Sequence, residues 1–260
     1  MDDYWQKQGT EPLFPDILWS RPETKLGAGK LLIIGGNSFG FAAPGTAFTA
    51  ATAAGAGSVR VLLPEALRKI VGSHMLEAEF APNNQSGSFS REALDAMLLH
   101  SHWADAVLLA GELGRNSETA VTLEQFAKKY QGLLTITRDA ADYFLQTPQD
   151  ILDRPQTMLV VSFEQLQKIA QHAGYHEPLL FSMGASLTAS WLHGFSQRHS
   201  ALLVLCHDNQ FFIAQNGRVA SQRAPHEEKI WRVTTAAKAS VFWMQNPAKP
   251  FEATVTSLIA

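Results

Sequence analysis

The chain lacks the features that mark secreted, membrane-spanning or nucleic-acid-binding proteins. Cys206 is its single cysteine, which excludes an internal disulfide framework. No apolar run approaches the roughly 20 residues that a membrane helix needs, and the polar start, MDDYWQKQGT, is unlike a signal peptide. The net charge of −3 gives no sign of a basic surface for nucleic acid or membrane lipid. We therefore expect a soluble cytoplasmic protein whose ligand is a small molecule.

Charged residues are also scarce, at 17% of the 260 residues, whereas hydrophobic residues make up 46%. This composition can form the core of one large α/β domain or two small ones. Residues 1–24 carry aromatic residues and prolines without periodicity and predict an N-terminal arm, with one short helix near residues 15–19. The arm's aromatic side chains must pack on the chain's own body or on a neighbouring subunit. Because so few charges cover the surface, we expect a homo-oligomer with the arm or a helical face at its interface.

The stretch from Lys30 to Pro64 is the most clearly organised part of the chain. The apolar run Leu31–Ile34 predicts a buried strand, and the glycine-rich loop Gly35–Gly45 leads from it into an alanine-rich helix. Gly55–Gly57 ends that helix before a second buried strand at Val59–Leu63. This order predicts a right-handed βαβ unit with parallel strands. The loop either presents its amides to an anion at the helix start or forms a tight turn that binds nothing.

Strands and helices alternate along the rest of the chain. Further strands are predicted at residues 75–80, 106–110, 133–137, 158–162, 201–206 and 210–215. Helices are predicted at residues 65–72, 91–98 (with Ser90 as N-cap), 119–130, 163–173, 178–197, 231–245 and 251–258. We therefore expect one α/β domain at residues 25–260, with a doubly wound, mainly parallel sheet and helices on both faces. Such sheets bind ligands at the carboxyl ends of their strands.

The βαβ stretch resembles the opening of the ADP- or ATP-dependent NAD(P)H-hydrate dehydratases, a branch of the ribokinase-like superfamily. The family's pattern KGxxGKxLIIGG and its later GAG are matched, without a gap between them, by Lys25, Gly27, Lys30–Gly36 and Gly55–Gly57. The resemblance implies a ribokinase-like fold and the removal of water from a hydrated nicotinamide cofactor, with ADP or ATP consumed and Mg²⁺ present. It also implies that the substrate is bordered by Gly36, Asn37 and Ala43.

Three further family motifs are partly kept, and each also has a plainer explanation. GPGLGR appears as Ala110–Arg115, where Gly114 is a candidate substrate contact or part of an ordinary βα loop, and where Glu112 would repel a phosphate. One aspartate of DADAL remains as Asp139, which can hold a ligand, although we favour a cap of the following turn or helix. Of TPHPGE only Glu164 remains, and a carboxylate there also fits the dipole of a helix start.

The family's nucleotide-binding turn, LKG, aligns with Cys206-His207-Asp208. A neutral histidine is a poorer phosphate partner than a lysine. Cys206 and His207 would point to opposite faces of a strand, which argues against a catalytic dyad and favours Cys206 as a core residue. The nucleotide contacts that the resemblance implies are His207, Asp208, Asn209, Thr234 and Thr235.

The largest departure from the family lies near the C-terminus. The superfamily motif GTGD begins a helix there, and in the dehydratases its aspartate is the main catalytic residue. The matching stretch, Lys229–Ala236, contains neither glycine nor aspartate, and Trp231 and Arg232 would fill the space that the glycines leave open. No catalytic residue can therefore be assigned, and we predict weak or absent dehydratase activity, although the loop Gly35–Gly45 should still accept a ligand.

Three interpretations of the function remain open. The chain is a dehydratase with displaced catalytic groups, a pseudoenzyme that acts by binding or assembly, or a relative that acts on another phosphorylated small molecule. The histidine pairs His100/His102 and His172/His176 have few carboxylates nearby, and we expect no metal site there.

Overall fold

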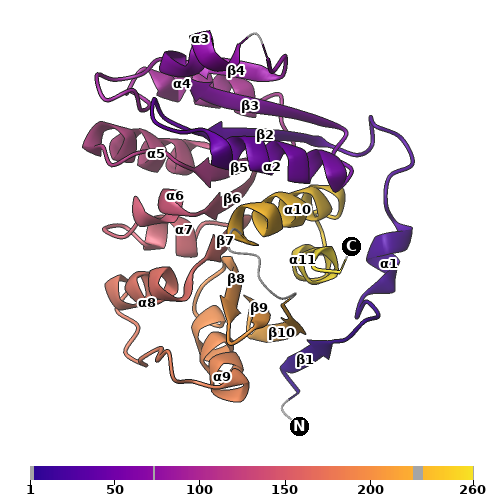
Figure 1. Ribbon diagram of the computed structural model, residues 1–260. Coiled ribbons are helices and arrows are strands. Elements are labelled where there is room, and N and C mark those ends of the chain that lie inside the picture. The colour runs from indigo at the N-terminus through magenta and orange to yellow at the C-terminus, as the bar shows by residue number, and fades with distance from the viewer. Residues whose placement is uncertain (1–2, 73, 225–230, 260) are drawn as a thin grey trace.

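One mixed sheet, in the strand order β1-β10-β9-β8-β7-β6-β5-β2-β3-β4, runs through the molecule (Figure 1). The computed structural model describes residues 3–72, 74–224 and 231–259. Neighbouring strands are parallel except at β8–β9 and β9–β10, which are antiparallel. The strands are β1 (Trp5–Gln8), β2 (Lys30–Gly35), β3 (Ser58–Pro64), β4 (Ala78–Ala81), β5 (Ala106–Gly111), β6 (Leu133–Thr137), β7 (Thr157–Val161), β8 (Leu202–His207), β9 (Gln210–Gln215) and β10 (Arg218–Arg223).

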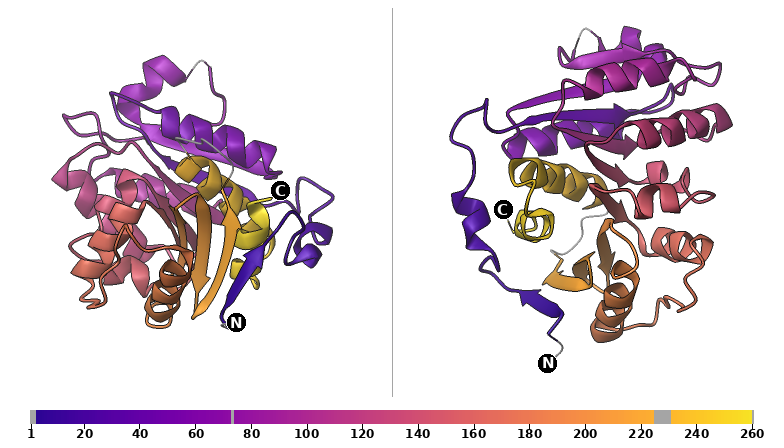
Figure 2. Two further views of the ribbon diagram at one scale, coloured as in Figure 1. Left: turned by 60° about the horizontal axis from the view of Figure 1, so that its bottom comes forward. Right: turned by 180° about the vertical axis from the view of Figure 1, so that it is seen from behind.

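Helices cover both faces of the sheet, so its central strands are buried on both sides (Figures 1 and 2). One face carries α2 (Ala42–Ala53), α10 (Trp231–Gln245) and α11 (Pro250–Ser257). The other carries α4 (Ala93–Ser101), α5 (Ser117–Lys129), α7 (Gln149–Leu152), α8 (Phe163–His172) and α9 (Ala185–Ser196). Along β2, Leu31 and Ile33 enter the first layer while Leu32 and Ile34 enter the second, as a period of two requires.

The order of the strands reverses direction between β2 and β5. The chain proceeds from β2 to β3 and β4 on one side, then returns to place β5, β6, β7 and β8 on the other. The carboxyl ends of β2 and β5 approach each other closely there. A Cβ atom added to Gly35 would lie only 2.6 Å from the carbonyl oxygen of Gly111. A crevice at such a point is the usual ligand site of a doubly wound sheet.

The predicted strands of the central sheet and the βαβ unit of the front half are confirmed. β2, β3 and β5 are interior strands, and the helix at residues 15–19 is α1 (Pro15–Trp19). The short helix predicted at residues 65–72 is a 3₁₀ turn, η1 (Glu65–Leu67), followed by α3 (Arg68–Val71). Of the stretch that aligns with GTGD, Lys229 and Ile230 lie outside the described residues, and α10 begins at Trp231.

Several boundaries were predicted wrongly. Ser90 is not the N-cap of α4: the cap position is Glu92, and the Ser90 hydroxyl donates instead to the Glu92 carboxylate at 2.6 Å. The helix predicted over residues 178–197 begins only at Ala185, after Gly184, and the strand predicted at residues 75–80 is confined to Ala78–Ala81.

The N-terminal arm packs on the chain's own body. Its strand β1 pairs with β10, and Trp5 Nε1 donates to Ser221 Oγ at 2.9 Å. The Tyr4 ring stacks on His193 with centroids 4.0 Å apart, and Phe14 meets Phe251 edge-on. The arm therefore extends the sheet at one edge.

None of the helices in the described part of the chain has the length and apolarity required to cross a membrane.

Candidate functional site

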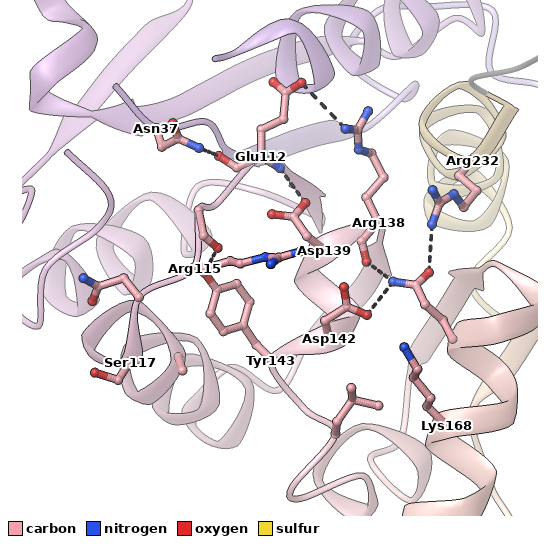
Figure 3. A pocket seen from close by; sticks show the side chains of 15 residues that line it. Asn37, Glu112, Arg115, Ser117, Arg138, Asp139, Asp142, Tyr143, Lys168 and Arg232 are labelled. Atoms are coloured by element: carbon pink, nitrogen blue, oxygen red, sulfur yellow. Dashed lines mark hydrogen bonds and ion pairs between the residues drawn. The ribbon is translucent and has the colours of Figure 1, made fainter. Parts of the chain in front are cut away.

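A cavity of about 800 Å³ opens at the carboxyl edge of the sheet, beside the point where the strand order reverses (Figure 3). The loops after β2, β5 and β6, together with α8 and the first turn of α10, supply its walls. Its polar lining residues are Asn37, Glu112, Arg115, Asn116, Ser117, Arg138, Asp139, Asp142, Tyr143, Gln165, Lys168 and Arg232.

Glu112 fills the anion position at the start of α2. Its carboxylate oxygen Oε2 accepts the backbone N–H of Ala43 at 2.9 Å, and Oε1 lies 3.7 Å from Nη2 of Arg138. Glu112 itself has a φ of 58°, in the left-handed region. The positive end of the helix dipole is thus matched by a carboxylate of the same chain.

Most other amides of the glycine-rich loop also have partners within the protein. The N–H of Gly36 donates to Gly111 at 3.0 Å, and the N–H of Asn37 donates to Gly40 at 2.9 Å. The amides of Ser38, Phe39 and Gly45 likewise have internal acceptors. The contacts of these amides favour the tight turn over the anion-binding loop, two interpretations that the sequence left open.

Asp139 holds the loop after β5. Its Oδ1 accepts the N–H of Glu112 at 2.7 Å, and its Oδ2 accepts the N–H of Leu113 at 2.9 Å. The predicted role as a cap of the following helix is wrong, because α6 (Asp139–Asp142) has no side-chain cap and the cap position is Arg138. The Asp139 carboxylate instead fixes the neighbouring loop at the switch point.

The donor set does not fit a protein-held Mg²⁺ ion. Both oxygens of Asp139 already accept amide hydrogens, and Glu112 is shared between Ala43 and Arg138. Within the described residues, no group of three His, Cys, Asp or Glu side chains lies close enough together to bind a metal.

Gln165 connects three walls of the cavity. Its Nε2 donates to the carbonyl of Arg138 at 2.7 Å and to Oδ1 of Asp142 at 2.8 Å. Its Oε1 accepts from Nη1 of Arg232 at 2.8 Å and from the N–H of Ser162 at 3.1 Å. Ser162 in turn caps α8 in a capping box. The amide thus uses its full hydrogen-bonding capacity and bridges Arg232 and Asp142.

The lining carries more positive than negative charge. Arg115, Arg138, Lys168 and Arg232 face three carboxylates, those of Glu112, Asp139 and Asp142. The chain as a whole has a net charge of −3, so this cavity is a local exception. Burial, and then the nearby charge of Arg138, lower the pKa of Arg232 below its usual value. The site is suited to an anionic ligand bound by side chains.

Three of the predicted substrate contacts line the cavity, namely Asn37, Gly114 and Asp139. Asn37 is almost buried, and its Nδ2 donates to the carbonyl of Glu112 at 2.6 Å. Gly36 and Ala43 are buried beneath the loop and do not line the cavity. Glu164 is exposed on α8, where it pairs with Lys168 at 2.6 Å, and it lines a neighbouring groove instead.

The predicted nucleotide contacts do not line this cavity. His207 is buried between the rings of Phe163 and Phe181, and its Nε2 donates to the carbonyl of Met183 at 3.0 Å. Asp208 and Asn209 form the left-handed turn between β8 and β9 and line a separate groove.

Thr234 and Thr235 on α10 and Cys206 on β8 also lie away from the cavity. Thr234 and Thr235 lie within α10, and neither side chain lines it. Cys206 is half-buried, and burial raises the pKa of its thiol to about 11, so it is protonated at neutral pH.

Sequence reasoning did not assign the basic residues and Gln165 to the site. Arg115 ends the stretch that resembles GPGLGR, Arg138 directly precedes Asp139 in the stretch that resembles DADAL, and Arg232 was expected only to fill the space of the missing glycines. The available signal was their position at strand ends and at a helix start, where a parallel sheet brings side chains together. Tyr143 was also missed: its hydroxyl donates to the carbonyl of Gly114, and burial raises its pKa to about 12.

A search of solved structures finds proteins with the same arrangement of strands and helices. A ribokinase-like superfamily protein from Enterococcus faecalis superposes with a TM-score of 0.72 at 17% identity, over 98% of this chain and 86% of that chain. The chain has the ribokinase-like fold.

More distant neighbours of the same fold have named activities. The ADP/ATP-dependent NAD(P)H-hydrate dehydratase from Bacillus subtilis, co-crystallised with ATP and Mg²⁺, gives a TM-score of 0.61 at 12% identity, over 95% of this chain and 86% of that chain. A phosphomethylpyrimidine kinase from Clostridium difficile gives 0.55 at 11% identity, over 88% and 97%. No family model and no curated protein matches the sequence. At these identities the ribokinase-like fold is shared, and the activity is a separate question.

Proposed function

We propose that the protein binds a phosphorylated small molecule, of the nucleotide class, in the cavity at the carboxyl edge of its sheet, and that it has little or no NAD(P)H-hydrate dehydratase activity. The observation that carries this proposal is the first turn of α10. There Arg232 faces the cavity and donates to Gln165, at the place where the dehydratase family has glycines and a catalytic aspartate.

Binding is supported by the balance of charge in the lining. Asp139 accepts two amide hydrogens, Glu112 lies beside Arg138 and Lys168 pairs with Glu164, so Arg115 and Arg232, which have no ion pair among the described residues, are left to attract an anion. The nucleotide class is supported by the fold, because a neighbour with this fold was crystallised with ATP and Mg²⁺.

Weak chemistry is supported by the loss of two groups. A positioned general base contributes about 10²–10⁴-fold to a rate. Loss of an anion hole removes about another 3 kcal/mol of transition-state stabilisation. An arginine cannot act as a base at neutral pH, because it stays protonated.

A thermal-shift screen against ADP, ATP, NADH and hydrated NADH tests the binding proposal. We expect at least one phosphorylated ligand to raise the midpoint of unfolding in a concentration-dependent way. Adenosine and nicotinamide, which lack phosphate, serve as controls and should have no effect. If no phosphorylated compound stabilises the protein more than these controls do, the proposal is wrong.

The second candidate function is a slow dehydratase with a displaced base, and Asp142 favours it. Asp142 is exposed at the cavity, and its Oδ1 accepts from Gln165, while Oδ2 accepts no hydrogen bond from the described residues. If this candidate is correct, Asp142→Asn should abolish the recovery of NADH from hydrated NADH while nucleotide binding persists. Equal turnover in the variant and the native protein would exclude Asp142 as the base.

A further inference from the structure

Arg232 is half-buried without a carboxylate partner. Its hydrogen bond within the described residues is to the neutral amide oxygen of Gln165, and no carboxylate there lies within ion-pair distance. Removing a guanidinium from water costs free energy that a neutral acceptor repays only in part. The side chain is therefore in a position that a negatively charged group would stabilise.

Arg138 approaches the same space from the end of β6. Its ion pair with Glu112 is long, at 3.7 Å, and that carboxylate already accepts the N–H of Ala43 at 2.9 Å. The carbonyl of Arg138 is held by Gln165, the residue that also holds the Arg232 guanidinium. The buried amide of Gln165 is thus hydrogen-bonded to two arginines from distant parts of the sequence, to the backbone carbonyl of Arg138 and to the guanidinium of Arg232.

Among the described residues no nearby carboxylate forms an ion pair with Arg232, although the charges of Asp142 and Asp139 act from a longer distance to raise its pKa. Both oxygens of Asp139 accept amide hydrogens of the loop after β5, and Asp142 accepts from Gln165. Two guanidinium groups that share a cavity repel each other unless an anion lies between them, and a phosphate can accept two parallel N–H bonds from each.

We propose that Arg138 and Arg232 form a phosphate subsite, in which side-chain guanidinium groups replace the glycine amides of a phosphate-binding loop, and that Gln165 is the positioning residue for Arg232. This inference rests on the proposed function of the cavity and names the group of the ligand that is recognised there. The phosphate belongs either to a phosphate ester or to free inorganic phosphate, and the experiment distinguishes the two.

Calorimetric titration with inorganic phosphate and with ADP tests the subsite. Arg138→Met and Arg232→Met should each weaken binding by about 10- to 100-fold, as expected for loss of a charge-assisted hydrogen bond. Arg232→Lys should recover only part of the loss, because an ammonium group lacks the planar fork. Lys69→Met is the matched control, since it removes one positive charge from the exposed part of α3 and should change binding less than twofold.

A double-mutant cycle tests the positioning role of Gln165. Gln165→Leu should weaken phosphate binding, but adding it to Arg232→Met should cause no further loss if Gln165 acts through Arg232. Additive losses would overturn the positioning role. Circular dichroism and the unfolding midpoint of each variant establish that it is folded.

The outcomes separate this inference from the proposed function. If ADP binds the native protein and both arginine variants equally well, the subsite is wrong while the proposed function stands. If inorganic phosphate binds through both arginines but no phosphorylated small molecule binds, the subsite stands and the proposed function falls. Failure of the native protein to bind phosphate at all overturns the subsite.

Discussion

Arg154 is an internal cation that joins two parts of the chain. It is 9% exposed, and its guanidinium donates to the carbonyls of Ala127, Tyr130, Gly132, Pro155 and Gln156 and to the hydroxyl of Thr157. Burial lowers its pKa to about 10, so it remains charged at neutral pH. One side chain thereby satisfies the end of α5 and the turn before β7.

We predict that Arg154→Met lowers the free energy of unfolding by about 3 kcal/mol or more, because several buried carbonyls lose their donor at once. The free energy of unfolding of Arg154→Lys should fall between those of the native protein and Arg154→Met, because lysine keeps the charge but not the five N–H groups. Urea unfolding measures the difference. Arg91→Met on the exposed surface is the control, and an equal effect of the two methionine variants would contradict this account.

We predict that Glu112→Gln increases the affinity of the cavity for inorganic phosphate. The glutamine keeps an oxygen for the N–H of Ala43, while the negative charge beside Arg138 disappears. The weaker interaction with the helix dipole should lower stability by only about 0.3–1 kcal/mol. Calorimetric titration provides the test, and an unchanged or reduced affinity would show that Glu112 does not compete with the anion.

At this scale, the resemblance to the dehydratases predicted that Asn37, Gly114 and Asp139 contact one ligand, and the structure places all three in the lining of one cavity. The sequence did not predict the contacts of Asp139, which depend on how closely the loops after β5 and β6 approach. The sequence also did not predict the role proposed for Arg232. That role depends on a hydrogen bond from Arg232 to Gln165, two residues that are far apart in sequence and meet only in the folded chain.

The glycine turn between α2 and β3 shows how one element constrains another. A Cβ on Gly57 would lie 1.9 Å from the carbonyl oxygen of Lys25, whereas a Cβ on Gly45, inside α2, would have no neighbour within 4 Å. The two glycines therefore have opposite expected responses to the same substitution.

We predict that Gly57→Ala destabilises the fold strongly, because the backbone of residue 25 must move to admit a methyl group. Gly45→Ala should instead stabilise the protein by about 0.5–1 kcal/mol, since alanine restricts the unfolded chain and favours a helix. Thermal and urea unfolding of both variants measure these changes. A stabilised Gly57→Ala variant would contradict the close approach.

Strands with continuous apolar runs could be predicted from the sequence, whereas the two polar strands β1 and β10 could not. β2 and β5 are buried on both faces, so their composition identified them as strands. β1 and β10 read WQKQ and RVASQR, and neither sequence has a strong strand pattern. Their pairing depends on the arm reaching the far edge of the sheet, which is a tertiary contact that local sequence does not encode.

At the scale of the whole molecule, the prediction of a homo-oligomer remains to be tested. Charged residues are few, and two large apolar side chains are largely exposed, Trp19 of the arm at 85% and Leu26, just after the arm, at 89%. Light scattering at micromolar concentration should give a mass at least twice that of the 28.5 kDa chain. A monomer under these conditions would remove the prediction.

The most direct test of the central claim follows the recovery of NADH from hydrated NADH in the presence of ADP or ATP. The account predicts turnover at least about 100-fold below that of a dehydratase with an intact GTGD motif, because the stretch that aligns with this motif, Lys229–Ala236, contains neither glycine nor aspartate. Turnover within about tenfold of that enzyme would contradict it, and would mean that the catalytic base of this protein lies elsewhere in the cavity.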